Sequence, residues 1–201
     1  MRVVMHRLAS LAACVVAVVA GCAGAQTPGP QAPRVARDYF PLQRNAAWSF
    51  TSVDMDRGGI PGLVTMRVVR DDGAGGYYMQ QGPGAPALYE FAEGGLTRNG
   101  ELVLSNPIAR GTTWRGHGGD TYTIRHVGLT RTVTAGTFHD VIEVVRVAPD
   151  ATLTNGTEFR ETFFYAPNVG PIEGIVPVLV GPRDARRFRL TLRGYTLNGD
   201  L

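Results

Sequence analysis

The fold class is set by residues 187–193, which read RFRLTLR. Phe188, Leu190 and Leu192 alternate with polar residues, so the three apolar side chains point to one face of an extended strand. If this strand were a loose tail, each of these groups would stay in water at a cost of roughly 1.5–3 kcal/mol. We therefore predict a half-buried antiparallel strand over 187–196 that closes a sheet against an earlier strand.

The same period of two recurs upstream, between frequent turn signals. Asn99-Gly100 and Asn155-Gly156 are the strongest signals for a hairpin, because both residue types tolerate a positive φ. No stretch after residue 40 keeps a helical period for three turns. We predict an all-β fold, an antiparallel meander of about 9–10 strands that forms a curled sheet, barrel or sandwich. The other predicted strands are 46–54, 62–70, 76–82, 86–92, 101–104, 120–127, 130–135, 139–148 and 158–165.

The N-terminus has the organisation of an export signal. A basic start is followed by an apolar run over Leu8–Ala20, which is shorter than the roughly 20 residues that span a bilayer. The run ends in VAGC at 19–22, which resembles the bacterial lipobox. That resemblance implies a signal peptide over 1–21, cleavage between Gly21 and Cys22, and a diacylglycerol lipid on Cys22. An ordinary secretory signal cut near Ala25 is the alternative.

Residues 22–37 have the composition of a flexible tether. They contain Pro28, Pro30 and Pro33 and almost no large apolar side chain. At about 3.1 Å per residue, an extended tether reaches on the order of 45 Å from the lipid. By the same resemblance, Ala23 in place of aspartate after the cysteine implies the outer membrane, with the protein facing the periplasm. A single β-domain is predicted over 38–201.

Charge and cysteine content exclude several classes of function. Removal of Arg2 and Arg7 with the signal leaves 18 arginines against 17 acidic residues, and the chain has no lysine. This balance is not the basic face that nucleic-acid binding requires. The only cysteines are Cys14 and Cys22. The folded domain therefore has no disulfide and no thiolate metal site, and we expect no cofactor.

Three blocks resemble a group of poorly characterised bacterial lipoproteins. The first is DYFPL at Asp38–Leu42 followed by Trp48-Ser49-Phe50, although Arg44–Ala47 stands where these proteins usually have a glycine. The second is GTFHDVIEV at Gly136–Val144, and the third is FYAPNVGPI at Phe164–Ile172, with its Tyr-Ala-x-x-Val-Gly pattern. The resemblance covers about 30 residues and implies common descent without an assigned activity.

The local interpretation of these blocks is structural. We expect Tyr39, Phe40 and Trp48 to fill one end of the barrel as core aromatics, since large rings supply much of the buried area of a core. We expect residues 168–170 to form a tight turn between two strands.

Two pairs of residues are candidates for catalysis or metal binding. His139 and Glu143 would share a face of one strand, and His117 and Asp120 lie in or beside a glycine-rich loop. Neither pair has a third ligand at a recognisable spacing, so we predict no metal site. Solvated polar residues are the simpler interpretation of both. The chain also lacks a Gly-x-Ser-x-Gly elbow, so a serine hydrolase has no support.

A basic face remains on the last strand. Arg187, Arg189 and Arg193 share it, and it could meet an anionic ligand such as a lipid headgroup or glycan. An ordinary exposed polar face is the alternative.

The predicted function is that of a non-catalytic, membrane-anchored envelope lipoprotein that binds an apolar ligand or an envelope partner. A structural or assembly role without a ligand is the alternative, and a hydrolase or metal-dependent enzyme ranks last. An internal cavity would favour the ligand. A filled core with an apolar surface patch would favour assembly, and histidines clustered with acids in one cleft would favour an enzyme.

Overall fold

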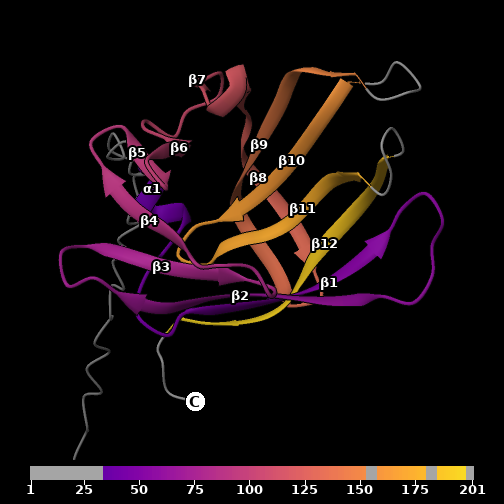
Figure 1. The fold of residues 1–201 in the computed structure, drawn as a ribbon, viewed down its shortest axis with the longest axis horizontal. Helices are drawn as coiled ribbons and strands as arrows, with labels where there is room; N and C mark the ends of the chain where they lie inside the picture. The colour runs from indigo at the N-terminus through magenta and orange to yellow at the C-terminus, as the bar shows by residue number, and fades with distance from the viewer. Residues whose placement is uncertain (1–33, 153–157, 180–184, 198–201) are drawn as a thin grey trace, which may run out of the picture. The chain divides into compact units, whose positions relative to one another are not determined.

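The structure, a computed structural model, describes residues 34–152, 158–179 and 185–197. Almost every element in this part is a strand (Figure 1). A short helix, α1 (Ala36–Tyr39), precedes them, and a single 3₁₀ turn lies at His117–Gly119. The strands are β1 (Ala47–Asp54), β2 (Gly62–Asp71), β3 (Gly76–Gln81), β4 (Ala87–Ala92), β5 (Gly95–Arg98), β6 (Glu101–Ser105), β7 (Thr113–Arg115), β8 (Thr121–Val133), β9 (Gly136–Thr152), β10 (Glu158–Ala166), β11 (Gly170–Leu179) and β12 (Ala185–Thr196).

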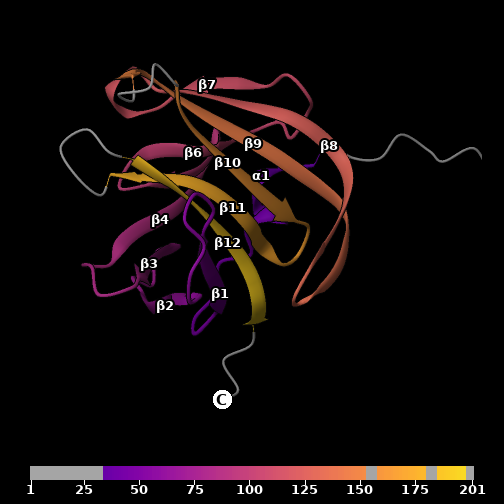
Figure 2. The same ribbon diagram turned by 90° about the vertical axis from the view of Figure 1, so that its right-hand side faces the viewer.

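All twelve described strands belong to one sheet, in the order β6-β5-β4-β3-β2-β1-β12-β11-β10-β9-β8-β7. Every neighbouring pair is antiparallel. The first and last strands meet in the middle of the sheet, and the sheet curls until its edges β6 and β7 approach each other (Figure 2). At this seam the indole Nε1 of Trp114 donates to the carbonyl of Leu102 at 3.0 Å. The prediction of an all-β antiparallel meander is confirmed, and its form is a nearly closed barrel.

The last strand behaves as its alternation predicts. β12 pairs with β1 on one side and with β11 on the other. Leu192 is fully buried opposite Phe50, whereas Arg187, Arg189 and Arg193 are exposed. The prediction that this strand closes the sheet with one apolar face is therefore confirmed.

The number of strands exceeds the prediction of about 9–10 because β5, β7 and β11 were not predicted. β5 and β7 are only four and three residues long, too short for a clear alternation. β11 contains Pro171 and Pro177, and proline removes a donor from the ladder and argues against a strand. The segments predicted at 120–127 and 130–135 form one strand, β8. Its register shifts on either side of Gly128, which has a φ of 74°.

The folded body begins earlier than the predicted boundary at residue 38. Ala36 is fully buried, and its backbone N–H donates to the side-chain Oδ1 of Asn106 at 2.7 Å. The guanidinium of Arg34 contacts the carboxylate of Asp140 at 3.1 Å. Residues 34–37, predicted as the end of the tether, thus pack on the barrel because these polar contacts and Ala36 hold them there. The rest of the predicted tether and the predicted signal helix lie outside the described residues.

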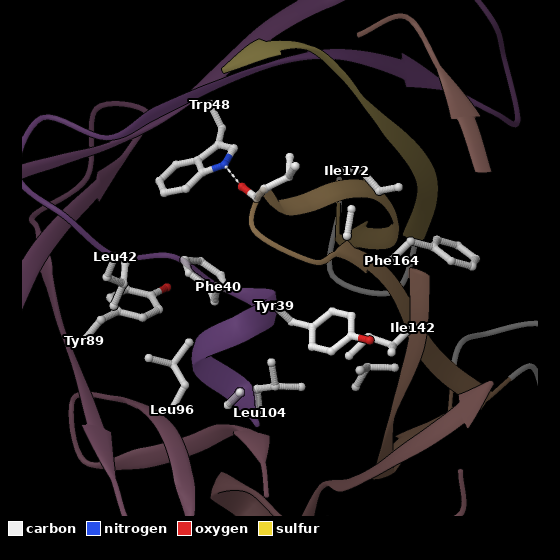
Figure 3. Packing of buried hydrophobic residues seen from close by; sticks show 14 of the residues in the cluster. Tyr39, Phe40, Leu42, Trp48, Tyr89, Leu96, Leu104, Ile142, Phe164 and Ile172 are labelled. Carbon is white, nitrogen blue, oxygen red and sulfur yellow. Dashed lines mark hydrogen bonds between the residues drawn. The ribbon is translucent and has the colours of Figure 1, made fainter. Parts of the chain in front are cut away.

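Aromatic residues fill one part of the barrel interior, as the sequence predicts (Figure 3). Tyr39, Phe40 and Trp48 are all buried. The indole Nε1 of Trp48 donates to the carbonyl of Val169 at 2.6 Å, and its ring lies 5.7 Å from that of Phe40. The predicted turn at 168–170 is confirmed. There, a Cβ on Gly170 would lie only 3.1 Å from the indole nitrogen of Trp48, in a backbone conformation with a φ of 101°.

Candidate functional site

The curled sheet surrounds a cavity of about 180 Å³ that is partly open to solvent and lies beside the aromatic core. Phe40 belongs both to this core and to the cavity wall. An apolar cavity of about 150 Å³ is large enough to bind benzene, so this cavity has room for a body the size of one small ring. Its apolar wall is formed mainly by side chains from strands on opposite sides of the barrel, which include Phe50, Val64, Val103, Val144, Phe163 and Leu190.

A second hollow, of about 500 Å³, lies over β1, β2 and the end of β12. It is lined in part by Thr65, Arg67 and Gln80, and it opens more widely to solvent. A ligand keeps more of its surface in water there than in an enclosed site, and enclosure is what ligand-binding sites provide. The smaller interior cavity is therefore the stronger candidate.

The interior cavity also has a polar wall. β10 presents Glu161, Phe163 and Tyr165 to it, because alternate residues of a strand share a face. Tyr89 from β4 and Tyr122 from β8 reach the same space. Burial raises the pKa of both Tyr89 and Tyr122, so these phenols stay protonated at neutral pH and can donate hydrogen bonds.

Tyr165 lies among the aromatic side chains of the cavity wall. Its side chain is partly buried, and it contributes to the lining of the cavity. Its ring lies 6.1 Å from that of Phe40 and 6.4 Å from that of Phe163. Burial, and then the nearby Tyr89, raise the pKa of Tyr165 far above its ordinary value. Within the described residues, the hydroxyl of Tyr165 has no hydrogen-bond partner.

Arg146 of β9 forms ion pairs with two carboxylates at this wall. Its Nε and Nη2 atoms both lie 2.6 Å from Oδ2 of Asp120, and its Nη1 lies 2.8 Å from Oε2 of Glu161. Burial alone would lower the pKa of Arg146, but the hydrogen bonds and charges of Glu161 and then Asp120 outweigh it and raise the pKa. The guanidinium therefore stays charged and holds Glu161 in place on the cavity wall.

The residues predicted as an anionic-ligand face lie on the solvent side of β12. Arg187 forms an ion pair with Asp56, and Nε of Arg189 lies 3.5 Å from Oε1 of Glu173. Their charges are thus partly balanced by neighbouring carboxylates. The predicted cleavage and lipidation residues, Gly21 and Cys22, lie outside the described residues.

The residues considered for catalysis have separate structural partners. His139 Nδ1 lies 3.1 Å from Oγ1 of Thr130, whereas Glu143 pairs with His126. Asp140 between them has a φ of 57°, so the strand is irregular between His139 and Glu143, and each of the two contacts a different residue of β8.

The second pair considered, His117 and Asp120, is likewise not supported as a site. Asp120 is buried and bonds to Arg146, and the side chain of His117 is outside the description. In the described ranges, no group of three or more His, Cys, Asp or Glu side chains is placed to hold a metal ion.

The polar residues of the cavity were not predicted from the sequence. A signal was present at Arg146, a charged residue flanked by Val144, Val145 and Val147 in an apolar strand. Its meaning depends on Asp120 and Glu161, which meet it only in the folded sheet. A second signal was that Glu161, Phe163 and Tyr165 follow each other at intervals of two residues, which places their side chains on one face of a strand.

The fold and the site together define the class of protein as a nearly closed antiparallel β-barrel, which is formed by one curled sheet. Aromatic side chains fill one part of the barrel interior, and the cavity occupies another part. None of the described helices is both long enough and apolar enough to cross a membrane.

No known family matches the chain, and no curated protein matches it. Two solved structures are similar to it. One is a protein taken to be exported, with a YmcC-like fold, from Bacteroides fragilis; it has 12% identity and a TM-score of 0.41 and covers 79% of this chain and 98% of its own. The other is a protein taken to be a lipoprotein from Parabacteroides distasonis, with 13% identity, a TM-score of 0.37 and the same two coverages.

Proposed function

We propose that this protein is a non-catalytic, membrane-anchored lipoprotein of the bacterial envelope whose barrel binds a small, largely apolar ligand. The observation that carries the proposal is the interior cavity of about 180 Å³, walled by apolar side chains from several strands. A cavity of this kind is the feature that distinguishes a ligand-binding barrel from one with a filled core.

The anchor follows from the sequence. A diacylglycerol on Cys22 and the proline-rich segment after it would hold the barrel near a membrane surface, for which we propose the periplasmic face of the outer membrane. No contact between the barrel and the lipid is needed for this.

Replacing Cys22 with serine should abolish incorporation of labelled fatty acid and leave either uncleaved precursor or soluble protein. The thiol is the group that receives the lipid, and serine does not supply it. Metabolic labelling with radioactive palmitate, followed by membrane fractionation, measures the effect. Cys14→Ser is the matched control and should label normally. Normal labelling of the Cys22→Ser protein would remove the basis for the anchor.

Toluene should bind saturably to the mature chain, residues 22–201, carrying Cys22→Ser so that no lipid is attached. Gly174→Met should abolish this binding. The Cβ of residue 174 would lie in ordinary contact with the Phe163 ring at 3.4 Å, so a methionine side chain would occupy the cavity that Gly174 lines. Isothermal titration calorimetry measures both proteins.

Gly62→Met is the control for this experiment. Gly62 is an exposed residue of strand β2, where a Cβ would have no neighbour closer than 3.9 Å, so its variant should bind toluene as the parent does. Equal binding by the Gly174 and Gly62 variants would locate the toluene outside the cavity and contradict the proposal.

A role in assembly is the second candidate, and exposed apolar side chains favour it. Ile60 is 98% exposed, Leu63 62% and Leu179 61%, at or near the ends of β2 and β11. Complementation of a deletion strain separates the two roles. A ligand-binding role requires that Gly174→Met fail and that a double variant with Ile60→Asp and Leu63→Asp succeed. An assembly role requires the reverse.

A further inference from the structure

We propose that the cavity selects a small neutral amphiphile, an apolar ring or short chain with one hydroxyl-like group that hydrogen-bonds to the hydroxyl of Tyr165. This inference rests on the proposed function and specifies its ligand. The apolar body would lie against residues such as Phe50, Val144 and Leu190, and the polar group against Tyr165.

The case for a polar contact begins with the unpartnered hydroxyl. Tyr165 is partly buried, lines the cavity, and has no hydrogen-bond partner among the described residues. Among the described residues, this hydroxyl is not one of the buried polar atoms that lack a partner, so solvent in the cavity can reach it and a ligand can displace that solvent. Tyr39 differs, since its hydroxyl already accepts from Arg34 and donates to the carbonyl of Asp140. A ligand with a hydroxyl would give Tyr165 the partner that Tyr39 already has.

The charges around Tyr165 determine that the polar group is neutral. Glu161 lies close enough to Tyr165 to influence its titration. The positive charge of Arg146 is shared between Asp120 and Glu161, so two carboxylates face one guanidinium. The charged residues that line the cavity are two cations, Arg98 and Arg146, and two anions, Glu161 and Glu173. Because these charges balance, neither an anionic nor a cationic group would gain enough there to offset the loss of its own hydration.

The volume sets the size of the ligand. About 180 Å³ is close to the volume that accepts one benzene ring, so the part of a ligand that the cavity surrounds is of about that size. Phenol and toluene are therefore suitable probes. The two molecules have nearly the same shape, but phenol carries a hydroxyl where toluene carries a methyl group. A difference between their affinities therefore measures the hydrogen bond that the ligand hydroxyl makes.

Calorimetry on the unacylated mature chain tests the inference. We expect phenol to bind about 2- to 10-fold more tightly than toluene, as one net hydrogen bond allows. Tyr165→Phe should reverse this order while leaving toluene binding within about twofold, because the ring remains and only the hydroxyl is lost. Tyr78→Phe is the matched control. Its ring lies under the guanidinium of Arg70, 3.7 Å from centroid to Cζ, and it does not line this cavity.

Each outcome has a distinct meaning. Saturable toluene binding that Gly174→Met abolishes, together with weaker phenol binding, would overturn this inference and leave the proposed function standing. A preference for phenol that persists in Tyr165→Phe would also overturn it. Tighter binding of benzoate or benzylamine than of phenol would contradict a neutral ligand. Failure of every probe to bind in the cavity would contradict the proposed function itself.

Discussion

Replacing Trp48 with alanine should lower the free energy of unfolding by about 3–5 kcal/mol, the range for truncating a large buried aromatic residue. Trp48 is only 1% exposed and packs against Phe40. Its indole also bonds to the carbonyl of Val169 across 121 residues of sequence. The substitution therefore removes core volume and separates the aromatic core from the β10–β11 turn at once.

Urea denaturation followed by circular dichroism measures this loss. Trp48→Phe is the graded control. It keeps an aromatic ring but leaves the buried carbonyl of Val169 without its donor, which should cost about 1–3 kcal/mol. Tyr195→Ala is the surface control, since Tyr195 is 43% exposed and its loss should be much smaller. A loss at Trp48→Ala no greater than that at Tyr195→Ala would mean that the aromatic core does not hold the barrel together.

Replacing Arg146 with methionine should also lower the free energy of unfolding, by about 1–3 kcal/mol, because two partly buried carboxylates lose their charged hydrogen-bond donor. The change leaves Asp120 and Glu161 facing each other without the guanidinium that holds both. Asp120 is 7% exposed, so water does little to compensate its charge. The penalty arises mainly from the two carboxylates left behind rather than from lost packing, because methionine replaces much of the aliphatic part of the side chain.

A triple variant tests this explanation. Arg146→Met combined with Asp120→Asn and Glu161→Gln removes the uncompensated charges and should recover most of the lost stability in the same denaturation assay. Arg187→Met is the control. Its ion pair with Asp56 is at the surface and should matter far less. If the triple variant is no more stable than Arg146→Met, charge compensation is not the role of Arg146.

The last strand, β12, shows what the alternation of apolar and polar residues can predict and what it cannot. Alternation predicts correctly that Phe188, Leu190 and Leu192 share a face, because the direction of a side chain in a strand depends only on its position along the backbone. It treats the three as equivalent. In the barrel, Leu192 is fully buried opposite Phe50, whereas Leu190 lines the cavity and is only partly buried. Burial depends on what lies across the interior, and alternation contains no information about that.

β11 shows the opposite case. Its prolines and glycines argue locally against a strand, yet it pairs with β10 and β12 along most of its length. Two extended neighbours provide a ladder on each side, and the sheet tolerates the missing donors of Pro171 and Pro177. Gly174 then has a particular use, because its lack of a side chain leaves room beside Phe163 and Leu190 at the cavity.

The sequence by itself determined the all-β class, the faces of the strands, the aromatic core and the turn at 168–170. These follow from periods and turn residues, which act over a few positions. The sequence also carries the prediction of a lipid on Cys22. Tertiary structure alone decided that the sheet curls round a cavity and that Asp120, Arg146 and Glu161 meet on its wall. It also decided that Tyr165 faces that space, where its hydroxyl bonds to no other residue that the structure describes. The physical reason is that curvature and strand order bring together side chains from separate strands, and each such contact depends on the register of the whole sheet.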